Sequence, residues 1–427
     1  MPELLRTGAG RHALVRRLEY AGWPVLERAA TLYRRHALTG TRVVAIVGSF
    51  GKTTTARAVS TALGLEESPR LEQNAFGSLA RNLLATWPGA KHRVLEVGIA
   101  EPGQMGAYAD MLQPDLTVVT CVGSEHHRSL HTLTETRAEK SAMVTALPAT
   151  GTAVLNADDA NVLWMAGQTR ARVITFGLGP DADVRATDVA LDWPYGTRFR
   201  LRCQGRCREV RTRLFGRHHV YPILAAVAVG IALGLDLERT LPALEWLPAT
   251  RGRLQLVELA DGVKLLRDDY KSTLETVERA LDLLAEIPGR RRLVVLGEVS
   301  EPPGSQGPLY RALGARVAAV AAGLVVLGGT FQRYATGATS ASMPRNMIVN
   351  AGRDVLAAAA AVRAMLEPGD VVLIKGRDTQ RLGRVALALA GRQVGCTIPE
   401  CSLKISACDD CPMLERGWRG RRPVALG

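Results

Sequence analysis

Short apolar runs alternate with stretches of helical periodicity over most of the chain. The first series of such runs is Val43–Val47, Val94–Val97, Leu116–Thr120 and Ala153–Asn156. A second series comprises Val263–Leu266, Leu293–Leu296, Gly323–Leu327 and Val371–Ile374. Buried strands separated by helices are typical of parallel sheets that are covered on both faces. The pattern therefore predicts an α/β protein made of two successive α/β units.

Three other features complete the predicted organisation. Residues 1–40 indicate short amphipathic helices, the second of which starts at Pro24. Their polar side carries Arg16, Arg17, Arg28, Arg34 and Arg35. The polar stretch Asp183–Arg213 favours β-structure, and Pro248 and Gly252 mark a boundary between the two units. We expect an N-terminal helical segment (1–40), a central domain (41–247), a C-terminal domain (248–392) and a tail (393–427).

The composition is that of an ordinary globular protein. Of the 427 residues, 47% are hydrophobic and 22% are charged, which excludes a disordered or fibrous chain. No apolar run reaches the roughly 18 residues of a membrane-spanning helix. The N-terminus lacks the continuous apolar segment of a signal peptide. We therefore expect a cytoplasmic protein.

The formal net charge of +13 favours anionic partners such as nucleotides, nucleic acids or membrane surfaces. Only seven of the 54 basic residues are lysines, so the excess reflects a general preference for arginine. Aromatic residues make up 5%, too few for base-stacking surfaces, and nucleic-acid binding is not expected. Each lysine of such a chain marks a place where a primary amine or a compact charge is useful.

The strongest motif is Gly48-Ser49-Phe50-Gly51-Lys52-Thr53-Thr54, between an apolar run and a helical stretch. Such loops present backbone N–H groups and a helix N-terminus to a phosphate. Lys52 would neutralise the β- and γ-phosphates of ATP, and the Thr53 hydroxyl would bind Mg²⁺. The spacing, G-x-x-G-K-T, is shorter than the usual G-x-x-x-x-G-K-[ST]. ATP and Mg²⁺ are therefore the expected cofactors.

This loop and the segments after it resemble the Mur ligase family of ATP-dependent amide-bond ligases, above all its members that add D-alanyl-D-alanine to a peptidoglycan precursor. The likeness extends from about Thr41 to Arg392. It implies a central phosphate-loop ATPase domain with a parallel sheet, followed by a smaller, Rossmann-like C-terminal domain. It also implies a reaction in which ATP phosphorylates a carboxylate and an amine attacks the acyl phosphate.

The resemblance gives roles to residues just beyond the predicted strands. Glu96 matches the family's strand-end carboxylate, which binds Mg²⁺. His126 matches the ligand of a second Mg²⁺ in an Asn-x-Gly-x-x-His pattern, although Cys121 replaces the Asn. Lys140 matches a lysine that CO₂ carbamylates, a reaction that needs a primary amine. Together with Thr53, these three residues are the expected magnesium ligands.

Other matching positions concern the nucleotide and the amine. Asn74 resembles part of a loop that approaches the γ-phosphate, and His219 stands where the family has an adenine-binding Asn. Arg253 resembles an arginine that reaches the ATP phosphates. Asp269 resembles the carboxylate that binds the ribose hydroxyls, and Lys375 resembles a catalytic lysine that faces the incoming amine.

Two features depart from the peptidoglycan enzymes. The phosphate loop begins at Gly48, whereas those enzymes carry a folded UDP-binding domain before it, so a UDP-muramoyl substrate is less expected unless another chain or a lipid carrier holds it. The tail contains a cluster of cysteines at positions Cys396, Cys401, Cys408 and Cys411. In a cytoplasmic chain such a cluster favours a metal over disulfides, with zinc first, an iron–sulfur cluster second and inert thiols as the alternative.

The sequence thus predicts an ATP-dependent ligase that joins a small-molecule or peptide carboxylate to an amino acid or short peptide, in cell-wall or peptide-like metabolite synthesis. A protein partner would bind through the N-terminal helices or the tail. The main alternative is a nucleotide-binding regulatory or scaffold protein derived from such a ligase, which the departures at His219 and Pro222 favour. The joint presence of Lys52, Glu96 and Lys140 argues against that alternative.

Overall fold

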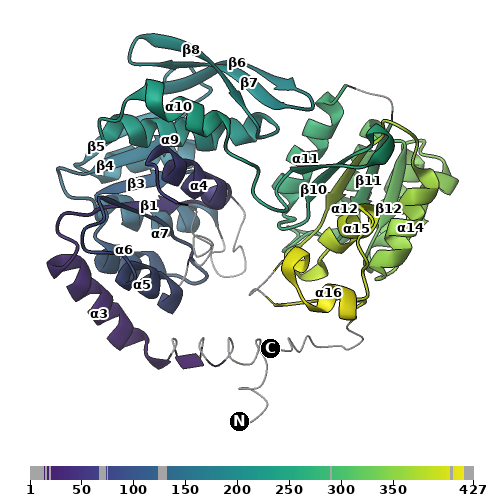
Figure 1. Ribbon diagram of the computed structural model, residues 1–427, viewed down its shortest axis with the longest axis horizontal. Helices are drawn as coiled ribbons and strands as arrows, with labels where there is room; N and C mark the ends of the chain where they lie inside the picture. Colours follow the sequence, from purple (N-terminus) through teal and green to yellow (C-terminus); the bar gives the residue numbers. More distant parts are fainter. Residues whose placement is uncertain are drawn as a thin grey trace. The chain divides into compact units, whose positions relative to one another are not determined.

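The computed structural model describes residues 14, 17–18, 21–66, 74, 76–123, 132–288, 291–403 and 407–417. The chain divides into an N-terminal unit, Arg16–Pro248, and a C-terminal unit, Ala249–Gly427. Each unit has one sheet with helices packed against it, so the predicted α/β fold class is confirmed (Figure 1).

The N-terminal unit contains an eight-stranded sheet in the order β2-β1-β3-β4-β5-β6-β7-β8. Its strands are β1 (Arg42–Val47), β2 (His92–Glu96), β3 (Leu116–Val119), β4 (Thr152–Asn156), β5 (Arg172–Gly177), β6 (Val184–Asp192), β7 (Gly196–Cys203) and β8 (Arg206–Thr212). Its described helices are α3 (Trp23–His36), α4 (Lys52–Ala62), α5 (Phe76–Leu84), α6 (Gln104–Leu112), α7 (Leu133–Thr145), α8 (Ala160–Leu163), α9 (Val220–Ala232) and α10 (Leu237–Glu245), with 3₁₀ turns at Trp164–Gln168 and Arg217–His219.

This sheet is mixed rather than purely parallel. Strands β1 to β6 run parallel to their neighbours, and β6, β7 and β8 pair antiparallel. The polar stretch that separates the two α/β series therefore extends the first sheet. The physical reason is that short connections can join only antiparallel strands, whereas parallel strands need a longer crossover.

Helix α9 supports the helix that follows the phosphate loop. Ten of its first eleven residues are buried, all except Tyr221, and the helix packs against α4, which begins at Lys52. A helix that is apolar on every side belongs in a core. The long apolar run of the sequence is thus an interior helix that supports the start of α4.

Arg34 corrects the expectation for the N-terminal helices. It was expected on the polar side of α3, but it is buried, and its guanidinium donates hydrogen bonds to the carbonyls of Leu112 and Leu38. It also forms an ion pair of 2.8 Å with Asp115. A guanidinium has five N–H donors, so one buried arginine satisfies several loop carbonyls at once.

The C-terminal unit contains a six-stranded sheet in the order β13-β12-β11-β14-β10-β9, in which only β9 is antiparallel to its neighbour. The strands are β9 (Gln255–Glu258), β10 (Lys264–Asp268), β11 (Arg292–Leu296), β12 (Gly323–Val326), β13 (Ile348–Asn350) and β14 (Val371–Lys375). The described helices are α11 (Leu274–Glu286), α12 (Gln306–Val320), α13 (Phe331–Ser340), α14 (Val355–Met365), α15 (Gly383–Leu389) and α16 (Met413–Arg416), with 3₁₀ turns at Ala260–Gly262, Arg345–Met347, Asp378–Gln380 and Cys408–Asp410.

The strand order of this second sheet reverses around β14. The chain goes from β10 past the position of β14 to β11, continues outward to β13, and then returns to fill the gap. In open α/β sheets ligands bind beyond the carboxyl ends of the strands at such a reversal. The residues that directly follow β10, β11 and β14 are therefore expected to lie near a ligand site.

Candidate active site

The phosphate loop connects β1 to α4, as the sequence predicts. Gly48 has φ +146°, and a Cβ at this position would lie 2.0 Å from the Thr120 hydroxyl oxygen. Gly51 has φ +80° and precedes the first residue of α4. The backbone therefore favours glycine at both positions, because a side chain would be strained at either one.

The neighbouring strand β3 fixes the loop. The Thr120 hydroxyl donates a hydrogen bond of 2.6 Å to the Phe50 carbonyl, and the Ser49 N–H donates one of 2.8 Å to the Cys121 carbonyl. The Phe50 N–H lies 3.4 Å from the Cys121 sulfur. Cys121, which replaces the family's Asn, thus helps to hold the phosphate loop.

Two lysines reach the same loop carbonyl. The Lys52 Nζ donates to the carbonyls of Gly48 and Ser49, at 2.8 and 3.1 Å. The Lys140 Nζ, on α7, donates to the Gly48 carbonyl at 3.3 Å. Both side chains are buried, and so are Thr53 and Thr54 in the first turn of α4. The structure therefore brings together Lys52 and Lys140, which the sequence separates by almost ninety residues.

Glu96 has the character of a metal ligand. It lies at the end of β2, paired in register with Ile46 of β1, and it is 4% exposed. Its Oε1 accepts a hydrogen bond of 2.7 Å from Asn74 Nδ2. Its Oε2 is buried and forms no hydrogen bond with any residue that the structure describes. A buried carboxylate oxygen with an open coordination position suits a hard cation such as Mg²⁺.

The remaining expected magnesium ligands have different outcomes. Thr53 lies at the start of α4, whereas His126 is outside the described residues. Within the described part of the chain, no three His, Cys, Asp or Glu residues are arranged to hold a metal ion. Of the expected ligands Thr53, Glu96 and carbamylated Lys140, only Glu96 is of one of these four residue types. The three residues can therefore still bind Mg²⁺.

His219 differs from an adenine-binding amide. Its ring is buried, its Nδ1 lies 2.8 Å from the Phe215 carbonyl, and it packs against the His218 ring with centroids 4.4 Å apart. One ring nitrogen is thus already in contact with the backbone. The ring therefore has fewer hydrogen-bonding groups left for adenine than the amide of an Asn would have.

In the C-terminal unit, Asp269, the carboxylate expected to bind the ribose, belongs to a row of three charged side chains. Arg267 lies 3.3 Å from Asp269 Oδ1 through its Nε, and it binds both oxygens of Asp409 in the tail, at 2.7 and 3.2 Å. Burial raises the pKa of Asp269, and the Arg267 guanidinium opposes that rise. Asp409 thereby fixes the guanidinium that opposes the rise in the pKa of Asp269.

Arg253 and Lys375 lie near Asp269 in different ways. The Arg253 guanidinium stacks on the Tyr270 ring, 4.6 Å from its centroid, which holds it at the end of β10. The Lys375 Nζ forms an ion pair of 2.7 Å with Asp268 and a hydrogen bond with the Lys271 carbonyl. Burial lowers the pKa of Lys375, and Asp268 opposes that shift. Lys375 is 1% exposed and contacts Asp268, and its expected role toward the incoming amine stays a prediction.

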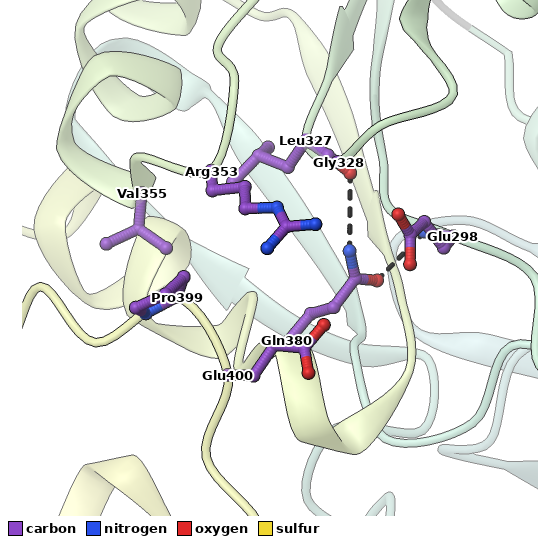
Figure 2. Close-up of a pocket in the computed structure, with 8 residues that line it drawn as sticks. All are labelled: Glu298, Leu327, Gly328, Arg353, Val355, Gln380, Pro399 and Glu400. Atoms are coloured by element: carbon purple, nitrogen blue, oxygen red, sulfur yellow. Dashed lines mark hydrogen bonds between the residues drawn. The ribbon is translucent and has the colours of Figure 1, made fainter. Parts of the chain in front are cut away.

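A pocket opens at the carboxyl edge of the second sheet. Figure 2 shows the residues that line it. The lining residues are Glu298, Leu327, Gly328, Arg353, Val355, Gln380, Pro399 and Glu400. Gln380 links the segments that follow β11 and β12. Its side-chain amide accepts a hydrogen bond of 2.8 Å from the Glu298 N–H and donates one of 3.3 Å to the Leu327 carbonyl.

The four tail cysteines are free thiols of intermediate exposure. Burial raises the pKa of Cys408 to about 12; Arg384 and Arg381 oppose the shift, and Cys401 and Cys396 add to it. The cysteines therefore lie near one another, although they do not form a ready-made metal site.

Several residues of these sites were not predicted from the sequence. Glu298 lies two residues beyond the end of β11, and Glu96 is the last residue of β2, so the same strand-end signal could have predicted Glu298. Arg353 follows β13, a strand too short to be predicted. The contact of Arg267 with Asp409 joins residues far apart in the chain, and no local pattern indicates it.

Comparisons with known proteins follow the same division of the chain. Residues 46–230 match the Mur ligase middle domain, and residues 252–377 match the Mur ligase glutamate ligase domain. The UDP-N-acetylmuramoyl-tripeptide–D-alanyl-D-alanine ligase of Mycobacterium tuberculosis (strain ATCC 25618 / H37Rv) is 31% identical over 376 residues, which cover 82% of this chain and 73% of the relative. The UDP-N-acetylmuramate–L-alanine ligase of Salinispora arenicola is 30% identical over 397 residues, covering 88% and 74%.

Solved structures show the same fold. MurF from Acinetobacter baumannii superposes with a TM-score of 0.75 at 22% identity, over 86% of this chain and 80% of that one. A Mycobacterium tuberculosis folylpolyglutamate synthase, complexed with ADP and AMPPCP, gives a TM-score of 0.66 at 16% identity, over 89% and 98%. No helix among the described residues has the length and apolar character of a membrane span.

Proposed function

The chain belongs to the Mur ligase family and is an ATP-dependent acid–amino-acid ligase, and we propose that it joins a small-molecule or peptide carboxylate to an amino acid or short peptide through an acyl phosphate. The names of its relatives make D-alanyl-D-alanine the first amine to consider and cell-wall synthesis the first context. We also propose a cytoplasmic location, with residues 41–247 as the ATP-binding domain and 248–392 as the ligase domain.

The observation that carries this proposal is the meeting of Lys52 and Lys140 at the Gly48 carbonyl, one strand away from the buried Glu96. Two ammonium groups on one carbonyl repel each other. Carbamylation of the Lys140 ammonium group by CO₂ forms an N–C bond, releases two protons and replaces this positive charge with a negative, carboxylate-like group. Lys140 would then pair with Lys52 and serve as a metal ligand.

The proposed reaction has two steps. The substrate carboxylate attacks the γ-phosphorus of ATP, which gives an acyl phosphate and ADP. The amine then attacks the acyl carbon, and phosphate and a proton leave as the amide forms. Lys52 and the loop N–H groups bind the phosphates throughout, and their fixed positions stabilise the charge that moves between oxygens.

Mg²⁺ would be held by Thr53, Glu96 and carbamylated Lys140, with His126 as the further expected ligand, and it would draw charge from the γ-phosphate. In the C-terminal unit, Asp269 would bind the ribose hydroxyls and Arg253 the phosphates. Asn74 would keep Glu96 oriented through its hydrogen bond. His219 would contribute its ring face to the adenine, and Lys375 would hold the segment that follows β10 through Asp268.

The test is ADP release from Mg²⁺-ATP by the purified chain. The amines are D-alanyl-D-alanine, other dipeptides and the amino acids, and the carboxylates include UDP-N-acetylmuramoyl-tripeptide. We expect one pair of substrates to raise ADP release at least about tenfold above either substrate alone. Lys52→Ala should abolish the stimulated release, whereas Lys91→Ala, which removes an exposed lysine before β2, should not. Failure to bind ATP, or ADP release that no amine stimulates, would overturn the proposal.

We also propose that the tail cysteines bind zinc, which would need their side chains to turn toward one another. Cys408 and Cys411 flank a tight turn, in which the Cys411 N–H donates to the Cys408 carbonyl at 3.2 Å, as C-x-x-C zinc ligands commonly do. Metal analysis of the full chain should find one zinc that Cys408→Ser loses. Cys207→Ser, which alters an exposed cysteine of β8, should retain it. A zinc-free chain purified without chelator would refute this proposal.

A further inference from the structure

Arg267 links a charged residue of the tail to the carboxylate expected to bind the ribose. Its guanidinium lies between two carboxylates, that of Asp269 just after β10 and that of Asp409 in the 3₁₀ turn Cys408–Asp410. The family match in this unit ends at residue 377, so Asp409 lies outside it. A residue of the tail therefore belongs to the surroundings of a residue that the common fold supplies.

The two carboxylates contact different parts of this guanidinium. Asp409 accepts hydrogen bonds from Nη1 and Nη2 of Arg267, at 2.7 and 3.2 Å. Asp269 is contacted only through its Oδ1, which lies 3.3 Å from the Nε of Arg267. No residue that the structure describes donates a hydrogen bond to the second oxygen, Oδ2, and the Asp269 side chain is 12% exposed. Asp409 thus occupies the terminal nitrogens of Arg267, and Asp269 keeps one oxygen for a ligand.

The turn that carries Asp409 is fixed by two further arginines. The Arg392 guanidinium donates a hydrogen bond of 2.8 Å to the Asp409 carbonyl, and Arg251 forms an ion pair with Asp410. Leu414, just after this turn, belongs to a hydrophobic core cluster of the C-terminal unit. The Asp409 carboxylate therefore has a defined position in front of Arg267.

Removal of Asp409 would change how Arg267 meets Asp269. The terminal nitrogens of a buried guanidinium would lose their acceptor, and buried donors without a partner are costly. A guanidinium binds a carboxylate most strongly through two parallel hydrogen bonds. Asp269, already in contact through Nε, is the carboxylate that Arg267 could then bind in this way. Both oxygens of Asp269 would be occupied, and a ribose hydroxyl would have to compete for them.

We propose that Asp409 is a positioning residue of the nucleotide site, which holds Arg267 so that Asp269 keeps one oxygen for the ribose hydroxyls of ATP. Asp409 itself does not contact the nucleotide. This inference rests on the proposed function, in which Asp269 binds the ribose. It adds that the tail, which the family match does not cover, sets how strongly the ribose is bound.

The test compares two probes, Mg²⁺-ATP and Mg²⁺-dideoxy-ATP, which lacks both ribose hydroxyls, in titration calorimetry with the full chain. We expect the unmodified chain to bind ATP at least about tenfold more tightly, because dideoxy-ATP cannot donate a hydrogen bond to the charged carboxylate. Asp409→Ala should weaken ATP binding at least about fivefold and change the affinity for dideoxy-ATP by less than about twofold. A merely structural role of Asp409 would instead weaken both affinities alike.

Asp410→Ala is the matched control, since Asp410 is the next residue of the same turn and pairs with Arg251 instead. It should leave both affinities unchanged. Asp409→Asn, which keeps the size of the side chain without its charge, should reduce the preference for ATP in the same direction as Asp409→Ala. An unaltered preference in these two variants, or equal losses for the two nucleotides, would overturn the inference alone. Equal binding of both nucleotides by the unmodified chain would overturn the proposed ribose contact of Asp269 and the inference with it.

Discussion

Lys140 and Lys52 show how much depends on single residues in this chain. Each is one of only seven lysines, and both reach the Gly48 carbonyl. An arginine at either position would keep a positive charge and lose the primary amine. The chemistry proposed for Lys140 requires that amine, so this residue gives the most direct test of the metal-binding arrangement.

Lys140→Arg should reduce the turnover number by about a hundredfold or more, because a guanidinium forms no carbamate and the metal loses a ligand. The KM for ATP should change much less, since Lys52 and the loop remain. Steady-state ADP release measures both values, and ¹³C NMR with labelled CO₂ should show a carbamate signal in the unmodified chain alone. Turnover near the wild-type level in this variant would be inconsistent with a metal-bridging Lys140.

Arg267 provides a prediction about pH. Its positive charge opposes the burial that raises the pKa of Asp269. Arg267→Gln should raise that pKa further, so the charged carboxylate would be lost at a higher pH as the solution is acidified. The acid limb of kcat/KM for ATP should therefore move to higher pH, whereas Arg267→Lys, which keeps the charge, should leave it closer to its original position. Coincident profiles for all three proteins would contradict a ribose-binding role for Asp269.

At this scale the sequence predicts residues that follow a strand and misses those that meet only through the fold. Glu96 and Lys375 follow apolar runs, so their place at a sheet edge could be expected. Arg34 looked like a surface residue because its helix has a polar side, but it is buried against the carbonyls of Leu112 and Leu38. Helical periodicity alone cannot predict that either carbonyl contacts Arg34.

Among the elements, the phosphate loop depends on two glycines for different reasons. At Gly48 a Cβ would overlap the Thr120 hydroxyl, whereas at Gly51 a Cβ would have no atom within 4 Å. Gly48→Ala should therefore displace the loop and abolish ATP binding. Gly51→Ala should cost only the strain of a left-handed residue, about 1–2 kcal/mol, and should keep measurable binding. Titration of both variants with Mg²⁺-ATP tests this order, and equal losses would argue against the contact with Thr120.

The apolar runs predicted the central strands of both sheets, because those strands are buried on both faces. Several other strands were missed or left imprecise, among them β5 inside the first sheet, although the edge strand β2 was predicted. Strand β13 has three residues and β9 has four half-exposed or exposed ones, so neither has an apolar run of useful length. The three antiparallel strands β6 to β8 were recognised only as β-leaning, since nothing in their sequence indicates which sheet they join.

For the whole molecule, each unit has a hydrophobic core of its own. Leu83 belongs to a core cluster of the N-terminal unit, and Leu265 to one of the C-terminal unit, and both are fully buried. Separate cores should unfold in separate cooperative transitions. Leu83→Ala and Leu265→Ala should each lower one transition in a calorimetric scan, at a cost of about 2–5 kcal/mol, and leave the other in place. A parallel shift of both transitions in either variant would show that the units unfold together.

The last strand of the first sheet has a consequence for how copies of this protein meet at high concentration. Strand β8 pairs with another strand on one side only, and an open strand edge is a template on which a second chain could continue the sheet. The Glu245 carboxylate of α10 covers part of its backbone, because it accepts a hydrogen bond of 3.1 Å from the Arg211 N–H. The exposed residues of this strand include Arg206, Arg208 and Arg211. Arg208 and Arg211 form ion pairs with Glu238 and Glu209, so the charges of this edge are partly compensated. The three arginines still exceed the one glutamate of the strand, and two copies approaching edge to edge would bring this excess of positive charge together, which disfavours continuation of the sheet.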